Sequence, residues 1–505
     1  MFCKINSAGV LGLGCAQIDV EVDVSGSWPG YQIVGLPDAA IQEAKERIRT
    51  AWKNAGLQFP SNHKIIVNLA PADVRKEGSH YDLPMAIGMF LASQKMKNTF
   101  DDSLFVGELA LDGSVRSANG ILPIALFAKK NNFKRLFVPA QNVKEAGLVS
   151  GIEIYSVSNF KELVEHITNI KKMEPVQPQN PEEWFTENLY ELDMAHVKGQ
   201  EFAKRALEIA ASGAHNILLS GPPGSGKTLL ARTFPSILPK MTLEEALEVT
   251  KIYSVSGNLF KKALITERPF RAPHHSASAV ALVGGGRFPK PGEISMAHRG
   301  VLFLDEFPEF PRSVLENLRQ PLEDGVVSIS RAQGSLTFPA QFTLVASQNP
   351  CPCGYFSDPD RMCTCSPSQI AHYKKKISGP LLDRIDLHVE VPRVAFEKLS
   401  KNDLAETSKN IRVRVENARK KQSERFENLP YHTNSEMRTK DIREFCKLND
   451  ESKELLRQAV EKLHLSARSY YRILKLARTI ADLENIDNLE TKHIAEALQF
   501  RARVE

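Results

Sequence analysis

The stretch Gly221-Pro222-Pro223-Gly224-Ser225-Gly226-Lys227-Thr228 matches the phosphate-binding pattern G-x-x-x-x-G-K-S/T at every fixed position. The apolar run 216–220 before it predicts a strand, and residues 229–232 after it predict a helix. In that context backbone N–H groups and the helix N-terminus bind phosphates. We expect Lys227 to reach the β- and γ-phosphates and the Thr228 hydroxyl to ligate Mg²⁺. The chain is therefore predicted to bind ATP or GTP.

The composition is that of an ordinary soluble globular protein, with 42% hydrophobic and 25% charged residues. Its 505 residues are enough for two to four domains. The net charge of +5 is small, so any DNA-binding surface must be local. Residues 1–17 make a poor signal peptide and no run approaches a membrane span, which predicts a cytoplasmic protein.

Predicted strands and helices alternate through the first third of the chain. Residues 39–54 and 121–130 have helical spacing, and residues 135–139 read as a strand. The proline-rich segment 171–184 predicts an extended linker. The expected domains are an N-terminal α/β domain (1–170), a linker (171–190), a nucleotide-binding core (191–395) with a cysteine cluster at 351–365, and a helical C-terminal domain (396–505).

A second pair of residues completes the predicted nucleotide site. The apolar run 301–304 reads as a buried strand, and Asp305 and Glu306 follow it. Asp305 would complete the Mg²⁺ shell, and Glu306 would polarise the attacking water. An acidic pair downstream of a full phosphate loop indicates hydrolysis.

Several segments resemble those of AAA+ ATPases. Val197-Lys198-Gly199-Gln200 is similar to the segment that packs by the adenine. Asn349, at the end of the predicted strand 342–349, matches the sensor 1 residue between the metal acids and the γ-phosphate. Such a core implies a parallel sheet around the phosphate loop.

The same resemblance assigns two arginines. Arg384 lies in a segment similar to the arginine-finger segment of magnesium-chelatase ATPases and MCM helicases, which implies a role at a neighbouring subunit's γ-phosphate. A surface arginine paired with Asp383 or Asp386 is the alternative. Arg468 fits sensor 2, with Arg472, one helical turn on, as a second candidate.

The N-terminal part resembles the Lon protease domain, of the ribosomal S5 domain 2-like fold. The matching segments are Lys76-Glu77-Gly78, Asp82-Leu83-Pro84-Met85-Ala86, Gly107-Glu108-Leu109, Gly113-Ser114-Val115-Arg116 and Asn119-Gly120-Ile121. The serine of the Lon peptidase dyad falls at His80 and its lysine at Leu122. Ser79 has no lysine to activate it, so we expect a structural domain without peptidase chemistry.

The order of these parts resembles the ComM/YifB family of magnesium-chelatase-like AAA+ ATPases over the whole chain. Its most specific segments are Ala272-Pro273-His274-His275-Ser276, Gly284-Gly285-Gly286-Arg287 with Pro291-Gly292-Glu293-Ile294-Ser295, and Gln348-Asn349-Pro350-Cys351-Pro352-Cys353-Gly354. The resemblance implies a hexameric ring motor with a C-terminal helical lid, acting as a DNA helicase or branch-migration enzyme in natural transformation. The alternative is a chelatase-type motor that remodels a protein or a metal-insertion partner.

Three basic residues are candidates for binding DNA. Two alternating runs flank residues 331–334 and predict a hairpin. MCM helicases carry a basic residue on a similar hairpin, which implies that Arg331 tracks the phosphate backbone. A solvated turn arginine is an equal alternative. Arg287 and Lys290 are weaker candidates of the same kind.

Four of the seven cysteines form two C-x-C pairs, Cys351 with Cys353 and Cys363 with Cys365. Four thiolates at this spacing suit one tetrahedral, structural Zn²⁺, although C-x-C is tighter than the usual C-x₂-C. A reduced loop or an oxidised pair is the alternative.

The adjacent residues His274 and His275 are also considered as metal ligands. Neighbouring side chains point in different directions in a strand or a helix, so a loop role is favoured over a shared metal.

Overall fold

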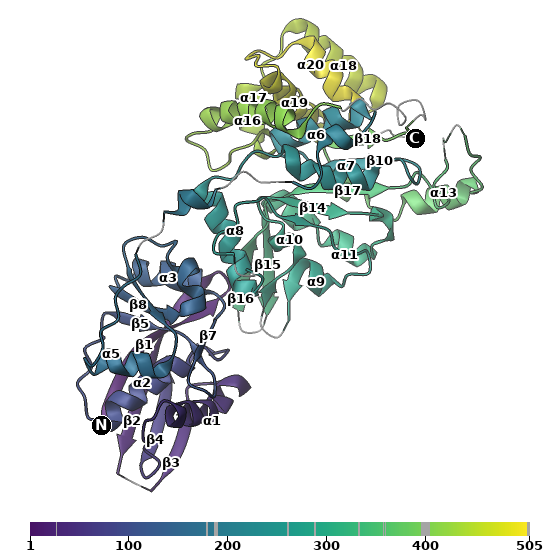
Figure 1. Ribbon diagram of the computed structural model, residues 1–505. Coiled ribbons are helices and arrows are strands. Elements are labelled where there is room, and N and C mark those ends of the chain that lie inside the picture. The colour runs from purple at the N-terminus through teal and green to yellow at the C-terminus, as the bar shows by residue number, and fades with distance from the viewer. Residues whose placement is uncertain are drawn as a thin grey trace. The chain divides into compact units, whose positions relative to one another are not determined.

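The computed structural model describes residues 1–26, 28–177, 180–185, 190–259, 262–286, 289–331, 334–356, 358, 360–394 and 405–501. The chain divides into two compact units (Figure 1). Unit 1 comprises Met1–Thr186 and Leu243–Thr266, and unit 2 comprises Glu187–Thr242 and Glu267–Glu505. Over the described ranges, every helix is too short or too polar to cross a lipid bilayer.

Unit 1 is built on a seven-stranded mixed sheet. In spatial order its strands are β3 (Gly30–Val34), β4 (Lys64–Ala70), β2 (Gly14–Ser25), β1 (Phe2–Leu11), β5 (Ser103–Phe105), β8 (Arg135–Pro139) and β9 (Glu153–Val157). β2 pairs antiparallel with both β1 and β4, and the other neighbours are parallel. A separate two-stranded ladder joins β6 (Glu108–Leu109) and β7 (Val115–Arg116).

The helices of unit 1 pack around this sheet. They are α1 (Ala39–Asn54), α2 (Asp82–Ser93), α3 (Ile121–Lys130), α4 (Val143–Ala146), α5 (Phe160–Ile167) and α8 (Leu243–Ser256), with short 3₁₀ turns at Ala140–Asn142 and Pro181–Trp184. The sequence predicts α1, α3 and β8 with their observed limits. It misses β1, whose inner positions include the small residues Ser7 and Ala8.

A stack of aromatic rings fills part of the core of unit 1. The parallel register places Phe105, Phe137 and Tyr155 side by side on β5, β8 and β9. Their ring centroids are 4.4 Å and 4.7 Å apart. Trp52 of α1 is 1% exposed in the same apolar cluster. Rings of this size bury a large apolar area and so stabilise the packing of these three strands.

The residues that align with the Lon dyad have structural roles. Burial lowers the pKa of His80 to about 4, and its Nε2 lies 3.2 Å from the Ala8 carbonyl oxygen. Leu122 is fully buried. The Ser79 hydroxyl donates a hydrogen bond to the Glu108 carboxylate.

Helix α8 belongs to unit 1 although it follows the phosphate-loop helix in sequence. Ser254 near its end donates a 2.5 Å hydrogen bond to the buried carboxylate of Glu145. The Gly120 amide donates to the Ser254 carbonyl at 3.1 Å, and the Leu122 amide donates to Glu145 at 2.8 Å. The chain therefore contributes a second, non-contiguous piece to the first unit.

Unit 2 contains a parallel sheet of five strands. Their spatial order is β11 (Phe270–Arg271), β14 (Val301–Leu304), β17 (Thr343–Gln348), β10 (Ile217–Ser220) and β18 (Leu387–Glu390). All four pairings are parallel. Together with the C-terminal helices, this sheet confirms the predicted α/β class. The strands expected before the phosphate loop, before Asp305 and before Asn349 are β10, β14 and β17.

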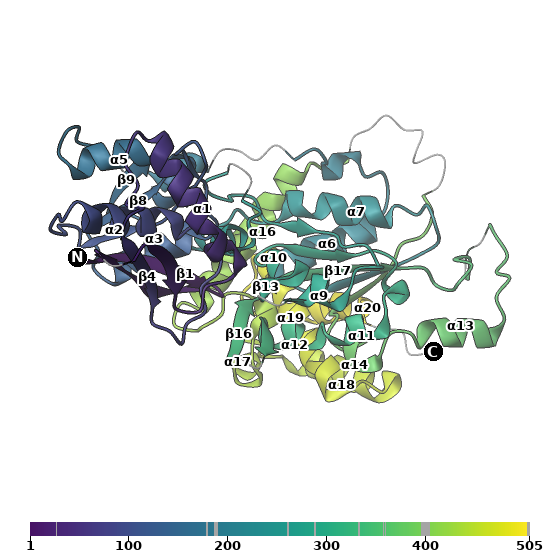
Figure 2. The same ribbon diagram turned by 90° about the horizontal axis from the view of Figure 1, so that it is seen from below.

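Helices and two hairpins surround the parallel sheet. The helices are α6 (Glu201–Gly213), α7 (Lys227–Thr233), α9 (Ala279–Val283), α10 (Glu293–Met296), α11 (Arg312–Glu316), α12 (Arg319–Asp324), α13 (Pro367–Lys374) and α14 (Gly379–Leu382). The antiparallel hairpins are β12 (Gly284–Gly285) with β13 (Lys290–Pro291), and β15 (Val326–Arg331) with β16 (Gly334–Pro339). The second confirms the hairpin predicted around residues 331–334. Helix α13 projects from the sheet in both views (Figure 1, Figure 2).

The C-terminal helices share a core with the parallel sheet. They are α16 (Ser408–Arg425), α17 (Thr439–Phe445), α18 (Asp450–Leu463), α19 (Ala467–Leu483) and α20 (Thr491–Gln499). Asp482 is fully buried among them and accepts hydrogen bonds from Arg425 (2.8 Å), Arg478 (3.1 Å) and Asn434 (2.8 Å). One buried carboxylate is thus the shared acidic partner of two guanidinium groups inside the helical layer.

Removing this carboxylate is expected to destabilise unit 2. Asp482→Asn leaves two guanidinium groups with their charge uncompensated, which costs about 3 kcal/mol of unfolding free energy. Denaturant unfolding of the full chain, followed by circular dichroism, measures the loss. Asp450→Asn, which removes an exposed partner of Lys453, is the control and should leave the transition unchanged. Equal transitions for the two variants would contradict the role given to Asp482.

Candidate nucleotide-binding site

Three neighbouring strands of unit 2 deliver the predicted nucleotide residues to one edge of the sheet. β10 ends directly before Gly221, β14 directly before Asp305, and β17 directly before Asn349. Because the strands are parallel, their carboxyl ends meet at the same edge, where open α/β sheets bind ligands. The strand carrying Asp305 is separated from the phosphate-loop strand by β17 alone.

Lys227 joins two of these strand ends. Its Nζ donates to the carbonyl oxygens of Gly221 (2.7 Å) and Pro222 (2.9 Å) and to Asn349 Oδ1 (3.3 Å). Only 8% of the residue is exposed, and burial lowers the pKa of its ammonium while the nearby Asp305 opposes that shift. A cation held in this way is well suited to a phosphate, because an anion supplies the charge that the carbonyl groups lack.

Thr228 and Asp305, the two predicted Mg²⁺ ligands, lie next to each other. The Thr228 hydroxyl donates to Asp305 Oδ2 at 3.0 Å. The buried Ser347, near the end of β17, donates a short hydrogen bond to the other carboxylate oxygen. The sequence prediction missed Ser347, although its position two residues before Asn349 on the same strand is a usable signal.

The phosphate loop has the shape of an anion cradle. Gly224 and Gly226 have φ angles of +76° and +92°, and a methyl group added to either would meet no atom within 4 Å. Ser225 Oγ is buried and makes no hydrogen bond to any described residue. This donor set fits a Mg²⁺-nucleotide. Thr228 and Asp305 would hold the ion, which would offset the charge of the phosphates.

The Glu306 carboxylate pairs with a residue outside the group formed by Lys227, Thr228 and Asp305. Glu306 is a non-glycine residue with φ of +53°, a conformation that costs energy and often marks a functional position. Its carboxylate lies 3.3 Å from His275 Nδ1, and the side chain is 56% exposed. The sequence predicts only a loop role for His275. Its position four residues after β11, the neighbour of β14, could have indicated this pairing.

Arg384 and Arg468 converge on a carboxylate that the sequence did not single out. Arg384 forms an ion pair with Glu323 of α12, and Arg468 Nη2 lies 3.7 Å from the same carboxylate. In the part of the chain that is described, neither guanidinium is bonded to residues 221–228. Arg472 instead pairs with Asp383 at 3.5 Å and donates to a backbone carbonyl.

Gln200, from the segment that resembles the adenine-binding one, touches the phosphate loop. Its side-chain amide donates to the Ser225 carbonyl oxygen at 3.2 Å and also donates to the Pro392 carbonyl. These hydrogen bonds tie the segment before α6 to the loop and to the chain after β18.

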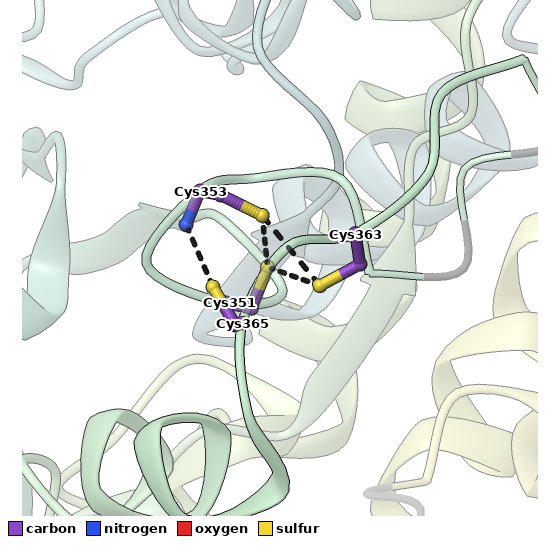
Figure 3. Close-up of side chains that lie close together, drawn as sticks. All are labelled: Cys351, Cys353, Cys363 and Cys365. Carbon is purple, nitrogen blue, oxygen red and sulfur yellow. Dashed lines mark hydrogen bonds between the residues drawn. The ribbon is translucent and has the colours of Figure 1, made fainter.

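The four cysteines of the C-x-C pairs gather in one cluster (Figure 3). Their sulfur atoms all lie within 4.8 Å of one another, and this is the one such group of potential metal ligands among the residues that the structure describes. The Phe356 amide donates to Cys351 Sγ at 3.3 Å, and the Cys353 amide donates to Cys365 Sγ at 3.4 Å. A tetrahedral cation site is compatible with this arrangement.

The charges of the cluster favour a cation. Backbone hydrogen bonds from Tyr355 and Thr364 lower the pKa of Cys353 to about 5. The pKa of Cys363 is raised to about 12 despite a backbone hydrogen bond at Cys365, because burial and the neighbouring sulfurs oppose another thiolate. A bound divalent cation removes that repulsion and stabilises all four thiolates.

Comparison with known proteins places this site in a family. Family models described as magnesium chelatase, subunit ChlI, match residues 20–142, 193–399 and, as the C-terminal part, 405–501. The chain is 43% identical to competence protein ComM of Haemophilus influenzae over 99% of its own length and 97% of the relative's. It belongs to the ComM/YifB family of magnesium-chelatase-like proteins.

Other relatives match different shares of the chain. YifB of Escherichia coli is 41% identical over 99% of this chain and 96% of the relative. The 67 kDa subunit of magnesium chelatase from Chlorobaculum parvum is 28% identical over a shorter region, 30% of this chain and 23% of the relative. Membership of this AAA+ group implies the use of a nucleotide and Mg²⁺.

Of the three DNA candidates, the structure describes the side chain of Lys290 alone. Lys290 lies on β13 and is exposed. Arg331 ends β15, but its side chain lies outside the described part, as does the whole of Arg287. The two hairpins are adjacent, since a Cβ added to Gly284 at the base of β12 would lie 3.2 Å from Ile329 Cδ1, in the middle of β15.

Replacing the carboxylate of Glu306 should separate nucleotide binding from hydrolysis. Glu306→Gln keeps the shape but cannot accept a proton from water, so we expect the ATPase rate to fall by about 100-fold or more. The affinity for Mg-ATP should change little, because Lys227, Thr228 and Asp305 are untouched. Steady-state phosphate release and equilibrium binding of a fluorescent ATP analogue measure the two quantities.

Glu454→Gln is the matched control, because this exposed glutamate of α18 pairs with Arg457 on the surface. It should hydrolyse ATP at close to the unmodified rate. A Glu306→Gln variant with an unchanged turnover number would mean that another group orients the water.

Proposed function

We propose that this chain is a ring-forming ATPase that moves DNA strands, a helicase or branch-migration motor in recombination during natural transformation. The observation that carries the proposal is the pair of adjacent hairpins on the ATPase unit, each with basic residues at or near its tip. The similarity to a protein named for competence supports the same proposed role in natural transformation. Such a motor, working on internalised DNA with ATP, acts in the cytoplasm.

The two hairpins carry positively charged side chains that can bind DNA phosphates without recognising the base sequence. Lys290 is exposed on one hairpin, and Arg287 and Arg331 lie near or at the tips by sequence. Lysine and arginine side chains that bind phosphates hold DNA of any sequence, which is what a translocating motor requires. In a ring, these hairpins would line the channel and track the backbone.

The positions of Arg384 and Arg468 support a site shared between subunits. Both arginines are paired with the single carboxylate of Glu323. A γ-phosphate of a neighbouring subunit is an anion that could replace that carboxylate and draw both guanidinium groups to the transferring phosphoryl. A finger of this kind acts head to tail, and head-to-tail interfaces form a ring when the rotation between neighbouring subunits closes. We propose a hexamer.

Each residue of the site then has a role in hydrolysis. Lys227 and the loop amides of residues 221–228 bind the phosphates, and Asn349 holds Lys227 from the neighbouring strand. Glu306 orients the attacking water once it leaves His275. Arg384 offsets the charge that develops on the γ-phosphoryl, with Arg468 beside it.

We also propose that the four cysteines hold one structural Zn²⁺. The sulfur set, the lowered pKa of Cys353 and the amide hydrogen bonds to sulfur support this. Four thiolates leave no open position on a tetrahedral ion, so the metal would brace the loop and take no part in hydrolysis.

The second candidate function is a chelatase-type motor that remodels a protein or a metal-insertion partner. The family models named for a magnesium-chelatase subunit favour it. It would use the same nucleotide residues, so only the response to DNA separates the two functions.

DNA should bind with a steep dependence on salt and should stimulate hydrolysis. We expect single-stranded, forked or four-way DNA to raise the ATPase rate severalfold. Lys290→Ala and Arg331→Ala should each remove one phosphate interaction and so reduce the slope of log K against log salt, measured on single-stranded DNA, by about 0.7. Fluorescence anisotropy at several salt concentrations and phosphate release measure these effects, and labelled four-way junctions report branch migration.

Lys453→Ala is the control, because Lys453 is an exposed lysine of α18 paired with Asp450. It should leave the slope unchanged. An ATPase rate that no DNA substrate changes, together with a DNA affinity that does not depend on salt, would reject the DNA motor. That result would favour the remodelling function.

A further inference from the structure

The four-cysteine loop starts at the nucleotide site itself. Only Pro350 separates Asn349, which holds the Lys227 ammonium, from Cys351. Cys351 is fully buried, and its carbonyl oxygen accepts a 3.0 Å hydrogen bond from the Gly354 amide. The first cysteine pair is therefore a tight turn anchored beside a residue of the site.

That turn packs directly on the phosphate loop. Gly354 has a φ of +85°, and a Cβ added to it would lie 2.6 Å from Pro223 Cδ and 2.8 Å from Pro223 Cγ. The same Cβ would be 3.8 Å from Asn349 Cγ. Only glycine fits here, both for its φ and for the close approach. The cysteine turn and the proline ring of the phosphate loop thus touch with no space between them.

The second cysteine pair is fastened to the segment that follows Glu306. Ser366, next to Cys365, caps α13 with a full capping box. Tyr373 on this helix is buried, with 7% of its surface exposed. Just beyond the helix, Lys376 Nζ lies 3.0 Å and 3.1 Å from the two carboxylate oxygens of Glu309. Both ends of the loop are thus attached to elements of the nucleotide site.

We infer that the metal bound by the four cysteines sets the shape of the phosphate loop, so that nucleotide affinity depends on metal occupancy. This inference rests on the proposed metal site. Without the ion, the metal cross-link between residues 351–353 and 363–365 is gone, and the turn at Gly354 is free to move away from Pro223. The phosphate loop then loses a packing partner, and Asn349 loses the support that aims it at Lys227.

The experiment compares metal content and nucleotide affinity in the full-length chain. Zinc is counted by elemental mass spectrometry. The Kd of a methylanthraniloyl-ADP probe, in the presence of Mg²⁺, is measured by fluorescence. The chain should carry about one zinc. The double variant Cys363→Ser, Cys365→Ser should lose it and bind the probe about tenfold more weakly. Gly354→Ala should keep the zinc and weaken the probe to a similar extent, because it pushes on Pro223.

Two variants serve as controls. Cys15→Ser removes an unclustered cysteine of unit 1, and Gly30→Ala adds a methyl where no atom lies within 4 Å. Both should keep the zinc and the affinity. Thermodynamic linkage supplies a second readout. Saturating Mg-ADP should increase the zinc affinity by the same factor by which zinc increases the ADP affinity. Zinc should then also be lost more slowly to a chelator.

The outcomes separate the two proposals. A purified chain that neither contains nor takes up zinc would reject the metal site and the inference with it. Loss of zinc with an unchanged Kd would reject the inference and leave the metal site standing. If the double variant does not fold, the unmodified chain stripped of zinc by a chelator takes its place, and an unchanged Kd after zinc removal overturns the inference.

Discussion

The nucleotide site depends on one buried ammonium group, that of Lys227. The three oxygen atoms that accept its hydrogen bonds follow the ends of two strands, β10 and β17. The hydrogen bond from Thr228 to Asp305 adds the end of a third strand, β14. This convergence is possible because β10, β14 and β17 are parallel and adjacent in the sheet. A bound phosphate would supply the negative charge that the carbonyl groups cannot, so the residues are already arranged around the place that the nucleotide would occupy.

The groups proposed to act only during hydrolysis are held away from that place. Glu306 is paired with His275, and Arg384 and Arg468 are paired with Glu323. Such pairs are partly exposed and individually weak, so a phosphate of the right geometry can displace them. The cysteine loop is different, because it packs against Pro223 without a gap. In our account, the loop fixes the binding geometry while the exposed pairs leave catalysis conditional on assembly.

Local pattern was enough to predict the elements that carry the site. The phosphate loop, the strands before Asp305 and Asn349, and the hairpin at residues 331–334 all have short-range signals. The cysteine cluster followed from spacing alone. Pairings between distant segments had no such signal. Nothing near Glu323 indicates that it meets Arg384 and Arg468, 61 and 145 residues later. Likewise, α8 joins unit 1 through Ser254 and Glu145, a pair that only the tertiary fold brings together.

The central claim is that each hydrolysis site is completed by an arginine of the next subunit, and mixing two inactive variants tests it most directly. Glu306→Gln lacks the group that orients water, and Arg384→Ala lacks the finger. In a mixed ring, an Arg384→Ala subunit with its own Glu306 can receive Arg384 from a Glu306→Gln neighbour. Our account predicts that the mixture hydrolyses ATP in the presence of DNA while neither variant does so alone. A mixture as inactive as its components, in rings shown to contain both variants, would contradict a shared site.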